Sequence, residues 1–321
     1  MQTDTPHIER WNTQDIDEQS ALMTGWEQEY RQLSCGKFNG NITVALGAQV
    51  CVARESTNQS LHQRVMLPKG QLGFGLVLQR EESLHINRKQ VSTACMVALE
   101  GGREYDFRTT GCTDTLGIII DEALVFGHDG AHTATIQSAL RQGVVPLDPN
   151  AAATLQNLGR ILALVLRREA TWPSNMPLPQ LAGTALNNIA LALAMSAGLP
   201  APVSSAAAER QARVVQRAIH FMRTNLDQEF SMADVCAATH VSQRTLQYHF
   251  ESCLHVSPQQ YLKALRLNAA RSLIRKLNLE GQQQRPSIAE IAAQCGYEHP
   301  SRFAGDFRRQ FGLLPSEALA A

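Results

Sequence analysis

Two stretches near the C-terminus decide the fold: SMADVCAATHVSQRTLQYHF at residues 231–250 and SIAEIAAQCGYEHPSRFAGDF at residues 287–307. Their first halves align at an offset of 56 residues and their second halves at 57, so the second turn is one residue longer. Each stretch has the pattern of a short helix, a tight turn and a second helix. The sequence therefore predicts two tandem helix-turn-helix units, at 232–253 and 288–311, an arrangement typical of proteins that read duplex DNA.

Polar residues mark where the predicted helices begin. Ser231 and Ser287 are expected to cap the first helix of each unit, because their hydroxyls can accept hydrogen bonds from free amides. Asp234 and Glu290 stand three residues later and complete capping boxes. Ser242 is expected to cap the second helix of the first unit.

Small and apolar residues define the inner side of both units. Alanines are expected to let the helices approach closely across the turn, at positions 233, 237, 289 and 293. Val241 and Tyr297 are predicted to fill the space beneath the turns. Four larger residues spaced by four are predicted to face the core, namely Leu246, Phe250, Phe303 and Phe307.

The outer face of each second helix carries the candidate DNA contacts. In the first unit these are Gln243, Arg244, Gln247 and Tyr248. In the second unit they are His299, Ser301, Arg302 and Asp306, with Arg308 and Arg309 for phosphates. Glutamine can bond to adenine edges and arginine to guanine, so these side chains suit direct reading of base pairs.

Charge supports this interpretation. Residues 1–208 contain 15 Lys and Arg against 19 Asp and Glu, whereas residues 209–321 contain 14 against 10. Only the C-terminal part has a net positive charge, which DNA phosphates attract. The alternative is a plain helical bundle with solvated polar faces, and two capped copies of the pattern make it the weaker interpretation.

Residues 209–321 resemble the DNA-binding domain of the AraC/XylS family of transcription regulators. The similarity rests on three motifs: Ser242-x-Arg244-x-Leu246-x-x-x-Phe250, then Ser257-Pro258-x-x-Tyr261-Leu262, and finally Phe303-x-x-x-Phe307-x-x-x-Phe311-Gly312-x-x-Pro315-Ser316. The family usually has Arg where this chain has Tyr248, so Tyr248 is expected to contact DNA differently. The resemblance implies an activator that binds double-stranded promoter DNA and recruits RNA polymerase.

The N-terminal part has a different pattern. A helix is predicted over Ser20–Leu33, followed by short apolar segments between turn residues, such as Ile42–Leu46, Gly73–Leu78 and Leu116–Ile120. Such spacing predicts a β-barrel or jelly-roll-like sensor domain. Helices are predicted over residues 150–168 and 178–196, and their apolar faces suit either a homodimer or packing on the barrel.

The sequence thus predicts an α+β protein with three parts. Residues 1–196 form a domain that senses an effector and dimerises, 197–208 form a small, Pro-interrupted linker, and 209–321 form an all-α DNA-binding domain. A long helix over Gln259–Leu277 is predicted to join the two helix-turn-helix units.

A second resemblance concerns the sensor. The segment Trp26-Glu-Gln-Glu-Tyr30-Arg-Gln-Leu33 followed by Gly36-Lys37-Phe38-Asn39-Gly40 is similar to the ethanolamine-operon regulator subgroup. This resemblance implies ethanolamine as effector and adenosylcobalamin as co-effector, without naming their contacts. Trp26, Tyr105, Glu104 and Asp106 are conceivable residues for an amine site, against the simpler view that they are core aromatics and solvated acids.

Several other classes of protein are disfavoured. The seven cysteines have no zinc-type spacing, and His128 and His132 stand in a turn-like segment, so no metal is expected. There is no phosphate loop or nucleophile motif, so an enzyme, such as a cupin fused to the DNA-binding domain, is the less favoured alternative. The other less favoured alternative is a non-specific architectural DNA-binding protein. The N-terminus has no signal-peptide pattern and no segment is apolar enough to span a bilayer, so we expect a soluble cytoplasmic protein.

Overall fold

The computed structural model describes residues 7–81, 83–87, 89–127, 133–167, 178–199, 206–280 and 285–320. The chain forms two compact units. The first contains residues 1–30, 39–58 and 63–203, and the second contains residues 31–38, 59–62 and 204–321. Each unit has hydrophobic clusters of its own.

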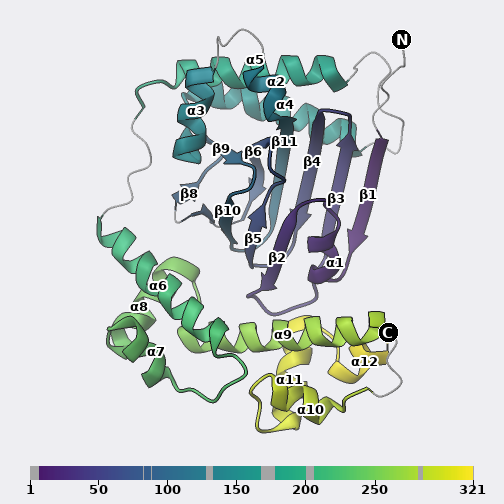
Figure 1. The fold of residues 1–321 in the computed structure, drawn as a ribbon, viewed down its shortest axis with the longest axis vertical. Helices are drawn as coiled ribbons and strands as arrows, with labels where there is room; N and C mark the ends of the chain where they lie inside the picture. Colours follow the sequence, from purple (N-terminus) through teal and green to yellow (C-terminus); the bar gives the residue numbers. More distant parts are fainter. Residues whose placement is uncertain are drawn as a thin grey trace. The chain divides into compact units, whose positions relative to one another are not determined.

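Two β-sheets form the body of the first unit (Figure 1). The larger sheet contains, in spatial order, β1 (His7–Thr13), β3 (Gly40–Leu46), β4 (Val50–Thr57), β11 (Thr113–Asp121), β6 (Gln71–Arg80), β9 (Cys95–Glu100) and β12 (Val144–Pro146), all antiparallel to their neighbours. The smaller sheet contains β2 (Glu27–Gln32), β5 (Leu61–Met66), β10 (Glu104–Thr109), β7 (Leu84–Ile86) and β8 (Lys89–Val91).

Of the predicted β-barrel or jelly-roll-like arrangement, the barrel is wrong, because the larger sheet is not closed. Among the described strands, β1 pairs only with β3 and β12 only with β9, so the larger sheet has two free edges. The strands themselves follow the predicted pattern: the predicted segments at 42–46, 73–78 and 116–120 all lie within observed strands. The error has a physical reason, because alternation of apolar residues shows that a strand is half buried but not whether its sheet closes.

Alternation along the strands separates two faces of the larger sheet. Val50, Val52, Phe74, Ile118 and similar alternate residues pack against helices on one face. These helices are α3 (Thr133–Gln142), α4 (Pro149–Arg167) and α5 (Leu178–Met195), and the short α2 (Glu122–Phe126) follows β11. Gly159 brings α4 close to β6, because a Cβ at this position would lie 3.0 Å from Leu78 Cδ2. The remaining alternate residues of each strand point to the opposite face of the sheet. That face is therefore free to line a cavity.

The predicted helix over Ser20–Leu33 is wrong. A short helix α1 (Ile16–Ala21) reaches only the first two residues of this range, and residues 27–32 form strand β2 instead. Gly25 has a φ of +81°, which breaks any helical run between the two elements. Leu22 and Trp26 pack on a small cluster with Ile42 and Val44. Leu22 and Trp26 therefore cover one apolar surface without belonging to one helix.

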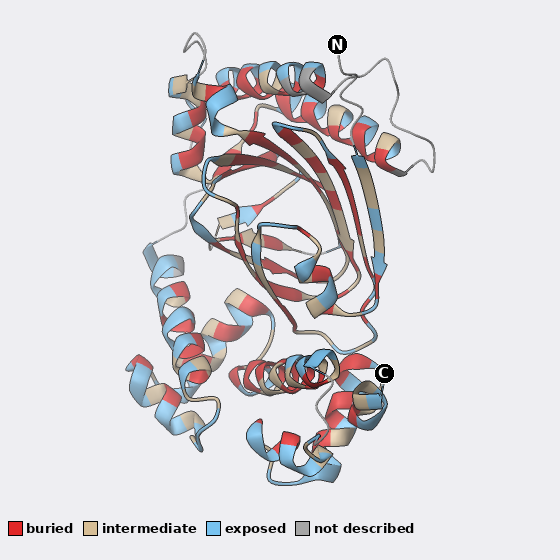
Figure 2. Cartoon of the chain, turned by 45° about the vertical axis from the view of Figure 1, so that its right-hand side comes forward, coloured by how far each residue is buried: buried red, intermediate tan, exposed pale blue. Residues whose placement is uncertain are grey.

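The second unit is helical and contains two cores that share one helix. Its helices are α6 (Ala206–Thr224), α7 (Met232–Thr239), α8 (Gln243–Leu254), α9 (Pro258–Glu280), α10 (Ile288–Gln294), α11 (Pro300–Phe311) and α12 (Pro315–Ala320). Tyr261 and Leu265 of α9 belong to the core of the first helix-turn-helix unit, and Leu267 and Ile274 to the core of the second. Figure 2 shows buried residues along much of this joining helix.

The boundaries of two predicted segments differ in the structure. α6 begins at Ala206, ahead of the predicted start at Glu209, and α9 continues to Glu280 rather than ending at Leu277. Residues 200–205 of the predicted linker lie outside the described residues, as do His128 and His132. Within the described parts of the chain, no helix is both long and apolar enough to cross a membrane.

Candidate nucleic-acid interface

The predicted capping residues are confirmed. Ser231 Oγ accepts a hydrogen bond from the Asp234 amide, and the Asp234 carboxylate accepts one from the Ser231 amide at 2.7 Å. Ser287 and Glu290 repeat this arrangement in α10. The amides and hydroxyls of the two serines lower the pKa of the Asp234 and Glu290 carboxyls. Both acids therefore stay ionised at the positive end of their helices.

The internal repeat extends to backbone conformation. α7 ends at His240 in the left-handed region (φ 57°), and the matching position in the second unit is Gly296 (φ 74°). α8 and α11 both contain 12 residues and end at His255 (φ 55°) and Gly312 (φ 81°). The two units therefore present their second helices, α8 and α11, as equivalent elements, and we call these the reading helices.

The candidate contact residues lie near the beginnings and on the outer faces of the reading helices. Gln243, Arg244, His299, Ser301, Arg302, Arg308 and Arg309 are all exposed. Tyr248 is 59% exposed, which is unusual for an aromatic residue and leaves its ring available for stacking. Gln247 is half-buried and donates a hydrogen bond to Glu251 of the same helix. Gln247 would therefore exchange this partner for a base edge on binding.

One open groove joins the two reading helices. It has a volume of about 940 Å³ and is bordered by Gln247 of α8 and by His299 and Arg302 of α11. Arg266 of α9 also lines it, with its guanidinium 5.7 Å from the centre of the Phe230 ring. The fold thus brings together predicted contacts that are far apart in sequence, and it places them on one side of the second unit.

Asp306 is an exception among the predicted contacts. Its side chain is buried, and its Oδ1 lies 2.6 Å from Lys263 Nζ of α9. The prediction that Asp306 belongs to the outer face is therefore wrong, because an ion pair holds it against the joining helix. The predicted role of the alanines is also wrong, since Ala233, Ala237, Ala289 and Ala293 are exposed and Ala292 is the buried alanine of α10. Val241 and Tyr297 do pack beneath the turns as predicted.

The starts of the two reading helices differ in a way that affects phosphate binding. In α8 the Ser242 hydroxyl accepts a hydrogen bond from the Thr245 amide at 3.2 Å. In α11 the N-cap residue His299 makes no side-chain cap hydrogen bond, and Pro300 at the first position has no amide proton. The following amides of α11 can therefore bind an anion, as helix N-termini do with DNA phosphates.

A basic face of α6 was not predicted from the sequence. Arg210, Arg213, Arg217 and His220 border an open groove of about 750 Å³ that also includes Ala238 of α7. Arg217 Nη2 donates to the carbonyl of Thr239, which ties this face to the end of α7. The spacing of three, four and three residues could have revealed the face, because it places all four side chains on one side of a helix.

The described residues hold no cluster of three or more His, Cys, Asp or Glu that could bind a metal ion. All seven cysteines are free thiols. Two of the residues considered for an amine site are occupied elsewhere: Asp106 pairs with Arg108, and Glu104 with Arg64. Tyr105 is buried and its hydroxyl accepts a hydrogen bond from the Glu100 amide.

Comparison with known proteins supports the assignment of helix-turn-helix structure to the C-terminal part of the chain. A family model described as a helix-turn-helix domain matches residues 235–321. A probable thc operon regulatory protein of Rhodococcus erythropolis is 32% identical over 106 residues, which is 33% of this chain and 31% of that protein. The transcriptional activator RhaR of Yersinia pseudotuberculosis is 32% identical over 96 residues, 30% of this chain and 31% of that protein.

A solved structure of a regulator from Chromobacterium violaceum, described as having an AraC-type DNA-binding domain, is 30% identical to this chain. The match covers 34% of this chain and 91% of the regulator's chain, with a TM-score of 0.30. The chain spans less than a third of the length of the two curated relatives. The similarity to them is therefore one of domains, and residues 235–321 of this chain match a helix-turn-helix domain.

Proposed function

We propose that this protein is a sequence-specific DNA-binding transcription regulator that answers to a small effector. The observation that carries the proposal is the pair of equivalent reading helices on one groove of the second unit. Names of the matched relatives, which are operon regulators and activators, support the same function.

In this proposal the reading helices enter successive major grooves of one DNA duplex. Gln243 and Gln247 contact adenine edges, and Arg244 and Arg302 contact guanine. Phosphates are bound by Arg308, Arg309, the start of α11 and the basic face of α6. His299, Ser301 and Tyr248 complete the contact surface, with Tyr248 packing against the sugar–phosphate backbone or an exposed base.

The remaining parts of the proposal concern regulation. The first unit binds the effector, and binding changes which conformations of the protein are populated. Homodimerisation is supported by exposed apolar side chains on two helices that pack together, Ile161 and Leu164 of α4 and Leu191 of α5. Activation through RNA polymerase rests on the resemblance and on relatives named as activators.

Ethanolamine is the effector suggested by the resemblance of residues 26–40, and Trp26, Gln28 and Tyr30 of that segment line a cavity of about 140 Å³ in the first unit. Adenosylcobalamin is much larger than the cavity of the first unit, which has a volume of about 140 Å³. A co-effector of that size would need a different surface, so we assign no residues to it.

Selection from a random pool of duplex DNA tests the proposed function. The full chain should enrich one motif, and a promoter fragment that contains it should bind at least a thousandfold more tightly than random DNA. An architectural protein would enrich no motif and would bind both DNAs about equally.

A further inference from the structure

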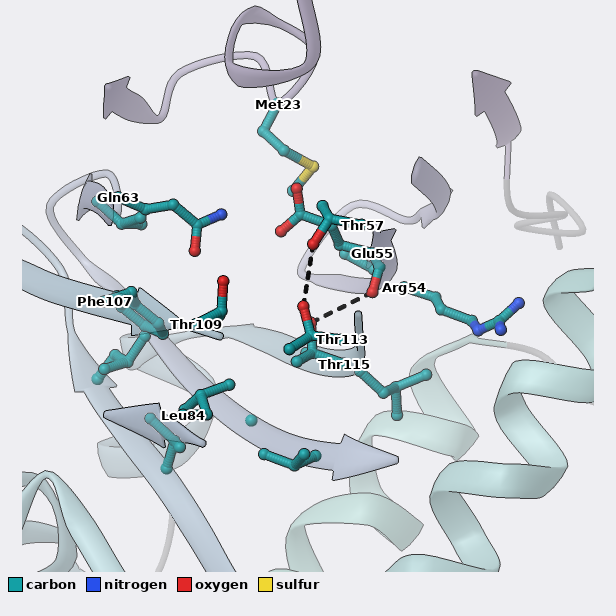
Figure 3. Close-up of a pocket in the computed structure, with 18 of the residues that line it drawn as sticks. Met23, Arg54, Glu55, Thr57, Gln63, Leu84, Phe107, Thr109, Thr113 and Thr115 are labelled. Carbon is teal, nitrogen blue, oxygen red and sulfur yellow. Dashed lines mark hydrogen bonds between the residues drawn. The ribbon is translucent and has the colours of Figure 1, made fainter. Parts of the chain in front are cut away.

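The first unit contains a partly open cavity of about 140 Å³, lined by residues of both sheets. Figure 3 shows polar side chains directed into it from both sheets, including Glu55, Gln63, Thr109 and Thr113. An apolar protein cavity of about 150 Å³ is known to hold benzene. The cavity therefore suits an organic molecule of about six non-hydrogen atoms.

The sequence creates this space by placing small residues side by side. On the inner face of the larger sheet, Gly117 pairs with Ala53 on one side and with Gly75 on the other. Val97 is the next residue in this row, opposite Gly75. A Cβ added to Gly75 would lie 3.3 Å from the Val97 Cβ, so larger side chains would fill the space where a ligand can lie.

Glu55 supplies an acidic group to this cavity. Glu55 is surrounded by protein atoms. Part of its side chain remains accessible to solvent, because it faces the cavity. Gln19 Nε2 and Tyr30 Oη donate to Glu55 Oε1 at 2.9 and 3.0 Å, and Oε2 has only the longer contact of 3.2 Å with the same tyrosine. One carboxylate oxygen is therefore left without a donor of its own among the described residues.

A positive partner for Glu55 is also missing from the described residues. The neighbouring Arg54 points away from the cavity in Figure 3, and its Nε lies 2.9 Å from Asp114 Oδ1. Burial raises the pKa of Glu55, and the hydrogen bonds from Gln19 and Tyr30 oppose that rise. A carboxylate removed from water needs a cation or several donors to remain ionised, so a ligand can supply what the protein does not.

Two further features select the same ligand chemistry. Gln28 Oε1 lines the cavity, is buried, and has no hydrogen-bond donor. Trp26 and Phe107 add aromatic walls, and aromatic faces attract organic cations. The cavity thus offers two acceptors, Glu55 Oε2 and Gln28 Oε1, together with surfaces that favour carbon and positive charge.

We propose that this cavity binds a compact organic ammonium ion, which donates N–H bonds to Glu55 and Gln28 and lays its carbon atoms against the row of Ala53, Gly117 and Gly75. The threonine hydroxyls of the cavity then receive any polar group at the other end of the ligand. In treating this ligand as the effector, the inference rests on the proposed function, although binding itself does not depend on DNA.

Matched ligands test the charge requirement in the full-length protein. Ethanolamine, ethylene glycol and glycolate have nearly the same size but are positive, neutral and negative, and n-propylamine tests whether the hydroxyl matters. Titration calorimetry in an amine-free buffer should detect ethanolamine or n-propylamine, with ethylene glycol at least tenfold weaker and glycolate undetectable. Equal binding of ethylene glycol, or binding of neither amine, would overturn the proposal.

A matched pair of variants tests the residue. Glu55→Gln keeps the shape and the contacts with Tyr30, and it should weaken amine binding about 10- to 100-fold, as expected for loss of a hydrogen bond to a charged group. Glu27→Gln changes an exposed acid in the neighbouring strand β2 and should leave the affinity unchanged. Unchanged affinity in Glu55→Gln, with thermal unfolding confirming that the variant is folded, would remove Glu55 from the site.

A DNA-binding assay of the same preparation separates the two proposals. Protein that binds its selected DNA motif but neither amine contradicts this inference and leaves the proposed function in place. Protein that binds the amines through Glu55 but enriches no DNA motif contradicts the proposed function alone.

Discussion

Asn268 of α9 pairs with the main chain of Gln32 as a neighbouring strand would. The Gln32 amide donates to Asn268 Oδ1, and Asn268 Nδ2 donates to the Gln32 carbonyl, both at 3.0 Å. Gln310 of α11 adds a hydrogen bond to the same carbonyl at 2.9 Å, and the Gln32 side chain returns one to the Gln310 carbonyl at 2.8 Å. All three residues are buried, so this network makes residues 31–38 part of the second unit.

Asn268→Ala should destabilise the second unit by about 1–3 kcal/mol, because it leaves the buried amide of Gln32 without an acceptor. Hydrogen–deuterium exchange of α9 and α11 in the full chain should report the loss as faster exchange in both helices. Lys276→Ala, an exposed change on the same helix, should alter stability by less than about 0.5 kcal/mol. Equal exchange in the two variants would show that the network contributes nothing.

A fragment of residues 206–321 should fold, since it retains both cores around α9, but it lacks the partner of Asn268. In this fragment Asn268→Ala should therefore be nearly neutral, within about 0.5 kcal/mol, when urea unfolding is followed by circular dichroism. A cost as large as in the full chain would mean that Asn268 acts within α9 alone. A fragment without a cooperative transition would show that residues 31–38 and 59–62 are needed for folding.

The second unit could be predicted in detail because its signals are local. Capping boxes at Ser231 and Ser287, and core residues such as Phe250 and Phe307, depend on neighbours within a few positions. The network of Gln32 could not be predicted, since it joins residues 236 positions apart through side-chain amides. Asp306 was misplaced for the same reason, because its partner Lys263 lies on another helix.

The first unit shows more clearly what cannot be predicted from local sequence patterns. Several of its strands could be recognised from short apolar segments between turn residues, but pairing, sheet edges and the strand at residues 27–32 depend on contacts distant in sequence. Glu55 carries no local signal of function. It becomes a candidate only when the register places Ala53, Gly117 and Gly75 in one row beside it.

His240→Gly should stabilise the second unit by about 0.5–1 kcal/mol, because His240 holds a left-handed conformation that glycine adopts without strain. The second repeat already has glycine at this position. The reciprocal change, Gly296→Ala, should destabilise, since its new Cβ would also lie 2.8 Å from Arg266 Nε. Thermal unfolding of the fragment measures both, and a fall in melting temperature for His240→Gly would contradict the assignment of strain.

Arg302→Ala should reduce affinity for the selected DNA motif by about 1–3 kcal/mol and relax preference at one base pair, if Arg302 reads a base. Arg308→Ala should instead weaken binding to all DNA about equally and reduce the slope of affinity against salt by about one unit. Both side chains are exposed on α11, so neither change should affect folding. Identical effects of the two variants on motif preference would show that Arg302 binds only phosphate.

Stability of the first unit should depend on pH through Glu55. Because its pKa in the folded protein is raised above the ordinary 4.5, the folded state holds this proton more tightly than the unfolded state. The resulting stabilisation is complete below about pH 4.5 and is lost as pH rises through the folded pKa, by about 1.4 kcal/mol for each unit of difference.

Glu55→Gln has no such proton, so its stability relative to the native protein should increase as pH rises from 4 to 8. The other titratable groups beside Glu55 do not interfere, because burial raises the pKa of Tyr30 well above 10 and that of Cys51 to about 12. Urea unfolding of both proteins across this pH range measures the difference, with Glu27→Gln as a control that should show no trend. A difference that does not change with pH would mean that Glu55 has the same proton affinity in the folded and unfolded chain, and the cavity would then lack the desolvated carboxylate on which ammonium binding depends.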